Sequence, residues 1–157
     1  MRSLSTPART VNDPCGTTIY NPCSVSGGLE YRLAEFFQAD SHGAAAVYLF
    51  GSVARGTSHP DSDVDIGVLF VVAPEPTFEA QPFALEGELE RLLGRAVQVV
   101  VLNQAPVDLR IRVLRDGRLV LDRDASTRIR FEVQTRNEAF DLEPILREYR
   151  SPAGTHR

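Results

Sequence analysis

Residues 46–72 read AVYLFGSVARGTSHPDSDVDIGVLFVV, and this stretch decides the fold. It opens with a short apolar run, 46–50, which is stopped by Gly51 and predicts a buried strand. It closes with a second apolar run, 64–72, which predicts another strand entered through acidic residues. The glycine, serine, proline and aspartate residues between the two runs predict a loop. The stretch is therefore expected to form two strands joined by a polar segment.

Helical and strand patterns continue on both sides of this pair. Two further apolar runs predict strands, at 96–102 and, at an edge of the sheet, 119–121. Pro144 is expected to end the last long helix, with one or two more helical turns in 145–150. The alternation predicts an α/β (α+β) fold, a small mixed β-sheet flanked by helices. Apolar residues recur at helical spacing within 29–37, 85–93, 107–114 and 129–140.

The chain has 157 residues, enough for one domain with a real core. Residues 1–28 are rich in Ser, Thr, Pro, Gly and Asn without apolar periodicity, which predicts a disordered N-terminal tail. We expect the domain at 29–150, a disordered C-terminal tail at 151–157, and part of the N-terminal tail to be an over-extended start.

Composition excludes several classes of function. The net charge of -4 argues against a sequence-independent nucleic-acid binder, but a divalent cation would still allow a nucleotide ligand. The chain has no lysine, so no Schiff base or lysine nucleophile is available. Its two cysteines, Cys15 and Cys23, match no zinc or redox spacing. Without a membrane-length apolar run or a signal-peptide pattern, we expect a cytoplasmic protein that makes no membrane contact.

Asp63 and Asp65 are the candidate catalytic residues. Side chains alternate along a strand, so both carboxylates point to one face, about 6–7 Å apart along the backbone. Two like charges there repel by about 2 kcal/mol at an effective dielectric near 20. A divalent cation removes that repulsion, and hard carboxylate oxygens suit Mg²⁺. The pair therefore predicts a magnesium site.

Gly51 and Ser52 supply candidate phosphate contacts. Glycine lets the backbone approach a phosphate closely, and a helix starting at Ser52 would favour an anion. Arg55 can neutralise phosphate charge. A glycine–serine turn or a D-x-D alone is usually structural; the two at fixed spacing on consecutive strands indicate nucleotidyl transfer. In that reaction a hydroxyl attacks the α-phosphate of a nucleoside triphosphate with the help of bound metal, and pyrophosphate leaves.

Ten residues separate Ser52 from Asp63, and this pattern resembles the signature of the DNA polymerase β-like nucleotidyltransferase superfamily. Within it, GSVARG at 51–56 followed by SDVDI at 62–66 is typical of the MNT (minimal nucleotidyltransferase) antitoxins, partners of HEPN-domain ribonuclease toxins. The resemblance covers 29–150, including LNQAP at 102–106 and FDLEP at 140–144.

The resemblance implies the polymerase β-like fold, Mg²⁺ on Asp63 and Asp65, and ATP as donor. It places Ser62 beside Gly51, Ser52 and Arg55 among the nucleotide-binding residues. It further implies an antitoxin that transfers AMP to a tyrosine hydroxyl of its cognate HEPN toxin.

One position departs from the family pattern. The superfamily usually supplies a third carboxylate from the next strand, where this chain has Gln98 and no acid. An amide can coordinate through its carbonyl oxygen but carries no negative charge and cannot act as a base. Glu88, Glu90 and Asp108 are possible substitutes, but their spacing favours none of them.

Two alternatives remain open. The chain could be a binding module that has lost catalysis and neutralises its partner stoichiometrically. It could also nucleotidylate a small molecule such as an aminoglycoside, although that chemistry normally needs an additional substrate-binding region. For the binding module, the candidate contact surface is the C-terminal stretch with Ile129, Phe131, Phe140, Ile145 and Tyr149.

Overall fold

The computed structural model describes residues 27–59, 62–75, 77 and 82–150, together with two short strands at 11–12 and 18–19. The four longer strands of a six-stranded sheet follow the order β6-β3-β4-β5. β3 pairs antiparallel with β4 and β6, and β4 pairs parallel with β5, so the sheet is mixed, as the sequence predicts. The four strands are β3 (Ala44–Phe50), β4 (Val64–Phe70), β5 (Val97–Val101) and β6 (Arg118–Asp122).

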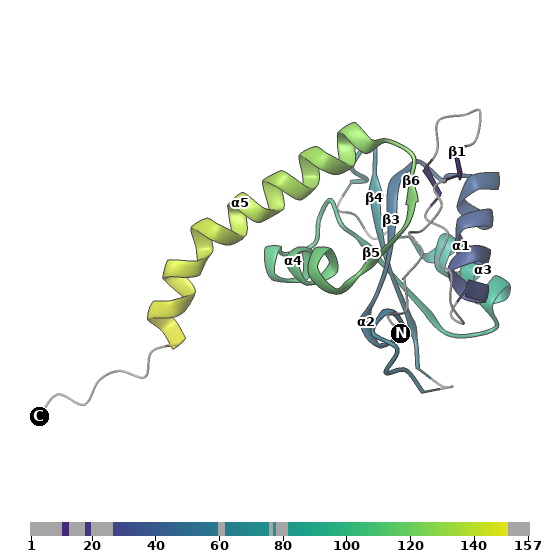
Figure 1. Ribbon diagram of the computed structural model, residues 1–157, viewed down its shortest axis with the longest axis horizontal. Helices are drawn as coiled ribbons and strands as arrows, with labels where there is room; N and C mark the ends of the chain where they lie inside the picture. The colour runs from purple at the N-terminus through teal and green to yellow at the C-terminus, as the bar shows by residue number, and fades with distance from the viewer. Residues whose placement is uncertain are drawn as a thin grey trace, which may run out of the picture.

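Helices cover both faces of this sheet (Figure 1). α1 (Gly27–Ala39) and α3 (Phe83–Leu93) lie on one face, and α4 (Val107–Asp116) lies on the other with the start of α5 (Ala125–Arg150). The remainder of α5 projects away from the sheet (Figure 1). A single-turn helix, α2 (Gly51–Ala54), follows β3 directly.

Strand alternation divides the core into two apolar clusters. Val64 and Ile66 of β4 join Val97 and Val99 of β5 in the cluster beneath α1 and α3. The residues between them must then point to the α4 and α5 face, because successive side chains alternate. That face carries the second cluster, formed by Ala45, Ala46, Tyr48, Phe50, Leu69, Leu102 and Val113.

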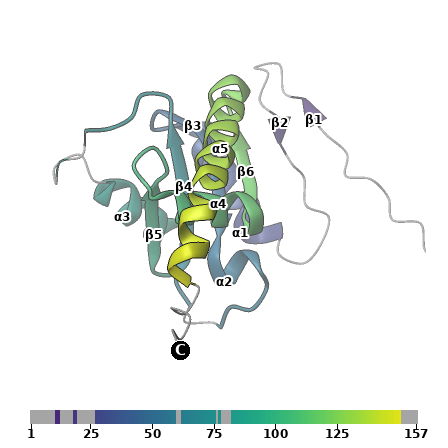
Figure 2. The ribbon, with the colours of Figure 1, turned by 90° about the vertical axis from the view of Figure 1, so that its left-hand side faces the viewer.

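The end of β3 and the starts of β4 and β5 lie together at one end of the sheet. Phe50, the last residue of β3, lies opposite Asp65 near the start of β4. Asp65 in turn lies opposite Gln98 near the start of β5. Figure 2 shows α2 at this end of the sheet, below the strands. The predicted site residues from 51 to 65 and Gln98 therefore lie at one end of the sheet.

Two predictions about elements are wrong. β6 is not an edge strand, because β2 (Thr18–Ile19) pairs with it through Thr18 and Asp122, and β1 (Val11–Asn12) pairs with β2. α5 does not end at Pro144 but runs to Arg150. Proline removes one helical hydrogen bond, here to the carbonyl of Phe140; that residue is 75% exposed, so water can satisfy the freed carbonyl.

The predicted tails at 1–28 and 151–157 lie outside the described residues, apart from β1, β2 and the first two residues of α1. Among the described helices, none is both long and apolar enough to cross a bilayer.

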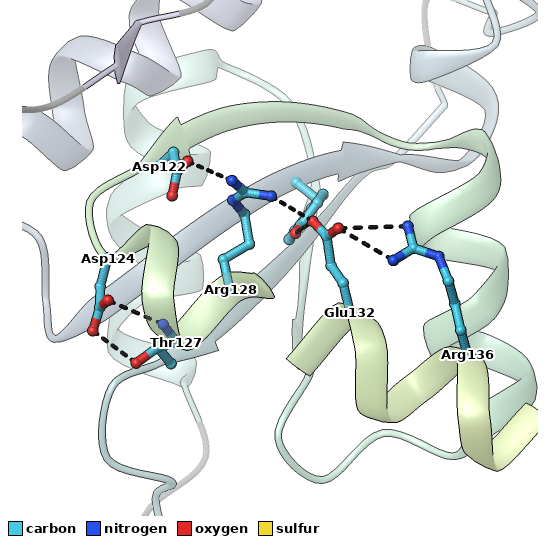
Figure 3. A network of polar contacts seen from close by, with 7 residues as sticks. Asp122, Asp124, Thr127, Arg128, Glu132 and Arg136 are labelled. Carbon is cyan, nitrogen blue, oxygen red and sulfur yellow. Dashed lines mark hydrogen bonds and ion pairs between the residues drawn. The ribbon is translucent and has the colours of Figure 1, made fainter. Parts of the chain in front are cut away.

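α5 is attached to the sheet by a partly buried polar network (Figure 3). The Arg128 guanidinium contacts Asp122 at 2.9 Å and Glu132 at 2.8 Å. Tyr48 of β3 donates its hydroxyl hydrogen to Glu132 Oε1 at 3.0 Å. At the helix start, Asp124 accepts hydrogen bonds from the backbone and hydroxyl of Thr127. Because the side chains of Arg128, Glu132 and Asp122 are mostly shielded from water, removing one partner would leave a poorly solvated charge, which costs more than breaking an exposed ion pair.

Candidate active site

The backbone at Gly51 lies against the carboxylate of Asp65. Phe50 ends β3 in an extended conformation, and Gly51 then adopts φ +72°, a left-handed conformation that favours glycine. A β-carbon at position 51 would stand 1.9 Å from Asp65 Oδ2, far inside van der Waals contact. Both the backbone turn and the approach of the carboxylate therefore require glycine at this position.

Asp63 and Asp65 form a pair of like charges. Asp65 is half-buried on β4, and Asp63 is exposed just before the strand begins. Burial and the neighbouring charge of Asp63 raise the pKa of Asp65 above its usual value, while Arg55 partly opposes the shift. An acid destabilised in its ionised form by a like neighbour is a site where a cation binds favourably.

Ser52 lies in α2, and Arg55 caps the C-terminal end of that helix. Ser52 is half-buried, and its carbonyl accepts hydrogen bonds from the backbone N–H of Thr57 at 3.0 Å and from its hydroxyl at 3.4 Å. Arg55 is exposed and lies within electrostatic range of both Asp65 and Asp116, the last residue of α4. Its guanidinium is thus free to meet a phosphate approaching from solvent.

Ser62 closes the loop before Asp63. Its hydroxyl oxygen accepts a hydrogen bond from the His59 N–H at 2.9 Å, and its own N–H donates to the His59 carbonyl at 3.0 Å. Arg95 donates to the Ser62 carbonyl at 2.6 Å and to the His59 carbonyl at 3.2 Å. Ser62 therefore has a structural role in addition to the nucleotide contact expected of it.

Gln98 is the β5 neighbour of Asp65. The two residues are in register across the parallel pair, and Gln98 is exposed between the buried Val97 and Val99. Both side chains point to the face opposite the α1 and α3 helices, because their flanking valines and isoleucine belong to that core.

The acids considered as substitutes for Gln98 lie elsewhere. Glu90 accepts a hydrogen bond from the Val97 N–H, and Glu88 lies 3.9 Å from His42. Asp108 is in the first turn of α4, at the opposite end of that helix from Asp116. None of the three is placed to complete the pair of Asp63 and Asp65.

Comparison with known proteins identifies the family. Residues 32–126 match the family described as polymerase beta, nucleotidyltransferase. This span is more than half of the chain. The chain belongs to that nucleotidyltransferase family. The expected polymerase β-like fold is thereby confirmed.

Solved structures support the same assignment. One chain of a toxin–antitoxin complex with AMP-PNP is 25% identical, with a TM-score of 0.65 over 76% of this chain and 94% of its own. A second, from the complex described as MntA-HpeT, is also 25% identical, with a TM-score of 0.64 over 76% and 93%. A third belongs to a complex of a tri-AMPylated Shewanella oneidensis HEPN toxin with an MNT antitoxin; it is 19% identical, with a TM-score of 0.56 over 80% and 98%. No curated protein sequence matches the chain.

The candidate site offers a divalent cation two carboxylate ligands. Asp63 and Asp65 carry hard oxygen atoms, which Mg²⁺ uses together with substrate phosphates. Among the described residues, no group of three His, Cys, Asp or Glu side chains could hold a metal. A cation at this site would take Asp63 and Asp65 as its protein ligands and would need phosphate oxygens or water for the rest.

A cavity of about 320 Å³ opens on the other side of α2. Its walls include Glu30 of α1, Leu49, Val53 and Arg95, and none of the predicted site residues. Because Leu49 and Val53 pack in the cluster beneath α1, the cavity lies on the face of the sheet away from Asp65.

Sequence reasoning missed the residues that hold the site together. Arg95 anchors the 59–62 loop, and Thr57 fixes the carbonyl of Ser52. Neither belongs to a motif, because each donates a hydrogen bond to a backbone carbonyl, which every residue type offers. The helix signals ending at Gly94 predict where β5 begins but carry no information about what Arg95 contacts.

Proposed function

We propose that this protein is an antitoxin that transfers AMP from ATP to a tyrosine hydroxyl of a cognate HEPN-domain toxin and so silences it. One observation carries the proposal: the Asp65 carboxylate, paired with Asp63, lies directly against the Gly51 backbone. Acidic ligands and a phosphate-binding turn then face the same space. The proposal is supported by related structures described as a toxin–antitoxin with AMP-PNP and as a tri-AMPylated HEPN toxin with its MNT antitoxin.

Each residue has a defined role in this proposal. The Gly51 backbone and the Ser52 hydroxyl contact the triphosphate, and Ser62 donates its hydroxyl hydrogen to it. Arg55 neutralises phosphate charge from the solvent side. Asp63 and Asp65 hold Mg²⁺, which when bound stabilises negative charge on the reacting phosphate. The tyrosine oxygen bonds to the α-phosphorus, the bond to pyrophosphate breaks, and the hydroxyl proton passes to solvent.

Co-expression with the toxin tests the proposal. The wild-type protein is expected to restore growth of cells that express the cognate HEPN toxin, and the Asp63→Asn/Asp65→Asn double variant is expected to fail. Both substitutions preserve side-chain shape, so the partner-binding surface stays intact. Pull-down of the toxin by the double variant serves as the control for binding.

A second candidate function is supported by Gln98. With an amide where a third carboxylate would stand, the fold could neutralise its partner by binding alone. In that case the double variant restores growth as well as the wild type does. Of the contact surface predicted for this function, Ile129 and Phe140 are exposed, but Phe131 packs against the core; the side chains of Ile145 and Tyr149 lie outside the described residues.

A further inference from the structure

We infer that Gln98 makes this a site for a single divalent cation, which binds together with the phosphates of the nucleotide. The inference rests on the proposed nucleotidyl-transfer function and deepens it. It concerns the order of binding: the protein without nucleotide holds the cation weakly, and a carboxylate at position 98 would create a stronger metal site.

The sheet register carries the first step. Asp65 and Gln98 are direct neighbours in the parallel pair of β4 and β5, where adjacent strands lie about 4.8 Å apart. Both side chains point to the same face of the sheet. Any ligand that β5 contributes beside Asp65 must therefore come from position 98, and the oxygen it offers belongs to a neutral amide.

The other acids of this region carry the second step. Glu86 and Glu90 of α3 accept hydrogen bonds from the backbone N–H groups of Val99 and Val97. Both glutamates are therefore used in joining α3 to the backbone of β5. Asp116 is engaged by both Arg115 Nε and Nη2 at 2.8 Å. Among the described residues, these contacts favour Asp63 and Asp65 as the anionic ligands for the site.

Charge balance carries the third step. Two carboxylates match the charge of one divalent cation, and Arg55 reduces the negative potential at Asp65. A cation held this way needs phosphate oxygens to complete its ligands. A two-metal site, in which both the attacking and leaving oxygens are clamped, requires further anionic ligands that these residues do not supply.

Mn²⁺ binding measured by electron paramagnetic resonance tests the inference without relying on turnover. Mn²⁺ is titrated into the wild type, into Gln98→Glu and into Gln38→Glu, with and without AMP-PNP. Gln98→Glu adds one charge to an exposed side chain of the same shape, so folding is preserved, which circular dichroism checks. Gln38→Glu makes the same change on α1, which covers the opposite face of the sheet. Gln98→Asp repeats the test with a shorter carboxylate.

The expected result has three parts. Wild type binds one Mn²⁺ with AMP-PNP and binds Mn²⁺ at least tenfold more weakly without it. Gln98→Glu binds Mn²⁺ without nucleotide at least tenfold more tightly than wild type, and Gln38→Glu does not. Two Mn²⁺ ions on the nucleotide-bound wild type, or no difference between the two glutamate variants, would overturn the inference while leaving the proposed transfer intact. A wild type that binds no Mn²⁺–AMP-PNP would overturn both.

Discussion

The β-carbon that Gly51 lacks would stand 1.9 Å from the carboxylate oxygen of Asp65. The Gly51 backbone at the end of β3 thus lies close to the Asp65 carboxylate near the start of β4, within the candidate active site. A phosphate bound by the Gly51 backbone is consequently brought beside the acid pair by the fold itself.

Gly51→Ala is therefore expected to damage both the site and the fold. The methyl group meets the Asp65 carboxylate and also strains a left-handed backbone, at a cost of about 1–3 kcal/mol in the free energy of unfolding. Gly56→Ala is the matched control, because Gly56 has φ +71° but no atom within 4 Å of its would-be β-carbon. Urea unfolding and AMP-PNP titration should show loss of nucleotide binding for Gly51→Ala alone. Equal loss in both variants would mean that backbone strain, not contact with Asp65, matters.

Asp65 should make stability depend on pH in the metal-free protein. Its pKa is raised in the folded state, so folding favours its protonated form. The stability from protonated Asp65 is complete below its usual pKa of 3.8 and is lost as pH rises through the folded value. With chelator at pH 7, Asp65→Asn should then be at least as stable as wild type. The advantage should shrink toward pH 3; a less stable variant at pH 7 would contradict the assignment.

Arg55 should affect nucleotide binding rather than folding. The side chain is exposed, so Arg55→Ala should leave the melting temperature unchanged. Losing one charge-assisted phosphate contact, worth about 1.5–3 kcal/mol, should weaken ATP binding by about tenfold or more. Arg55→Lys should recover part of the affinity, since it keeps the charge without the planar fork. Isothermal titration with AMP-PNP measures this, and an unchanged affinity for Arg55→Ala would remove Arg55 from the site.

Glu132→Gln should loosen the attachment of α5. Burial opposes ionisation of Glu132, but the Arg128 guanidinium and the Tyr48 hydroxyl outweigh it and hold the pKa of Glu132 below its usual value of 4.5. Removing the charge leaves Arg128 with one carboxylate partner, at a cost of about 1–3 kcal/mol in unfolding free energy.

The effect of Glu132 on stability also has a defined pH range. A lowered pKa gives stability that is complete above pH 4.5 and is lost as pH falls through the folded value. The difference between wild type and Glu132→Gln should therefore vanish in acid. Glu35→Gln, at an exposed position on α1, is the control; it should change neither the free energy of unfolding nor its dependence on pH.

Much of this architecture can be predicted from the sequence because local patterns determine it. The apolar runs place β3 to β6, and the helical stripes place α1, α3, α4 and α5. The 2-residue period of a strand predicts that Asp63 and Asp65 share one face, but β4 begins only at Val64, after Asp63. The register of β4 and β5 places Gln98 beside Asp65.

The remaining features depend on contacts between distant segments. The pairing of β2 with β6 joins Thr18 to Asp122 through the backbone, which leaves little trace in residue type. The network of Tyr48, Arg128 and Glu132 involves residues that read singly as an ordinary core tyrosine and ordinary helix charges. α5 continues past Pro144, and the carbonyl of Phe140 that the proline leaves without a helical donor lies where water can reach it.

Catalytic turnover on the toxin tests the central claim most directly. The protein is mixed at one-twentieth of the toxin concentration with ATP and Mg²⁺, and the intact mass of the toxin is followed with time. We predict that essentially all toxin gains the mass of one or more adenylate groups, and that none does with the Asp63→Asn/Asp65→Asn variant. A toxin that stays unmodified while the folded protein binds it would contradict the account.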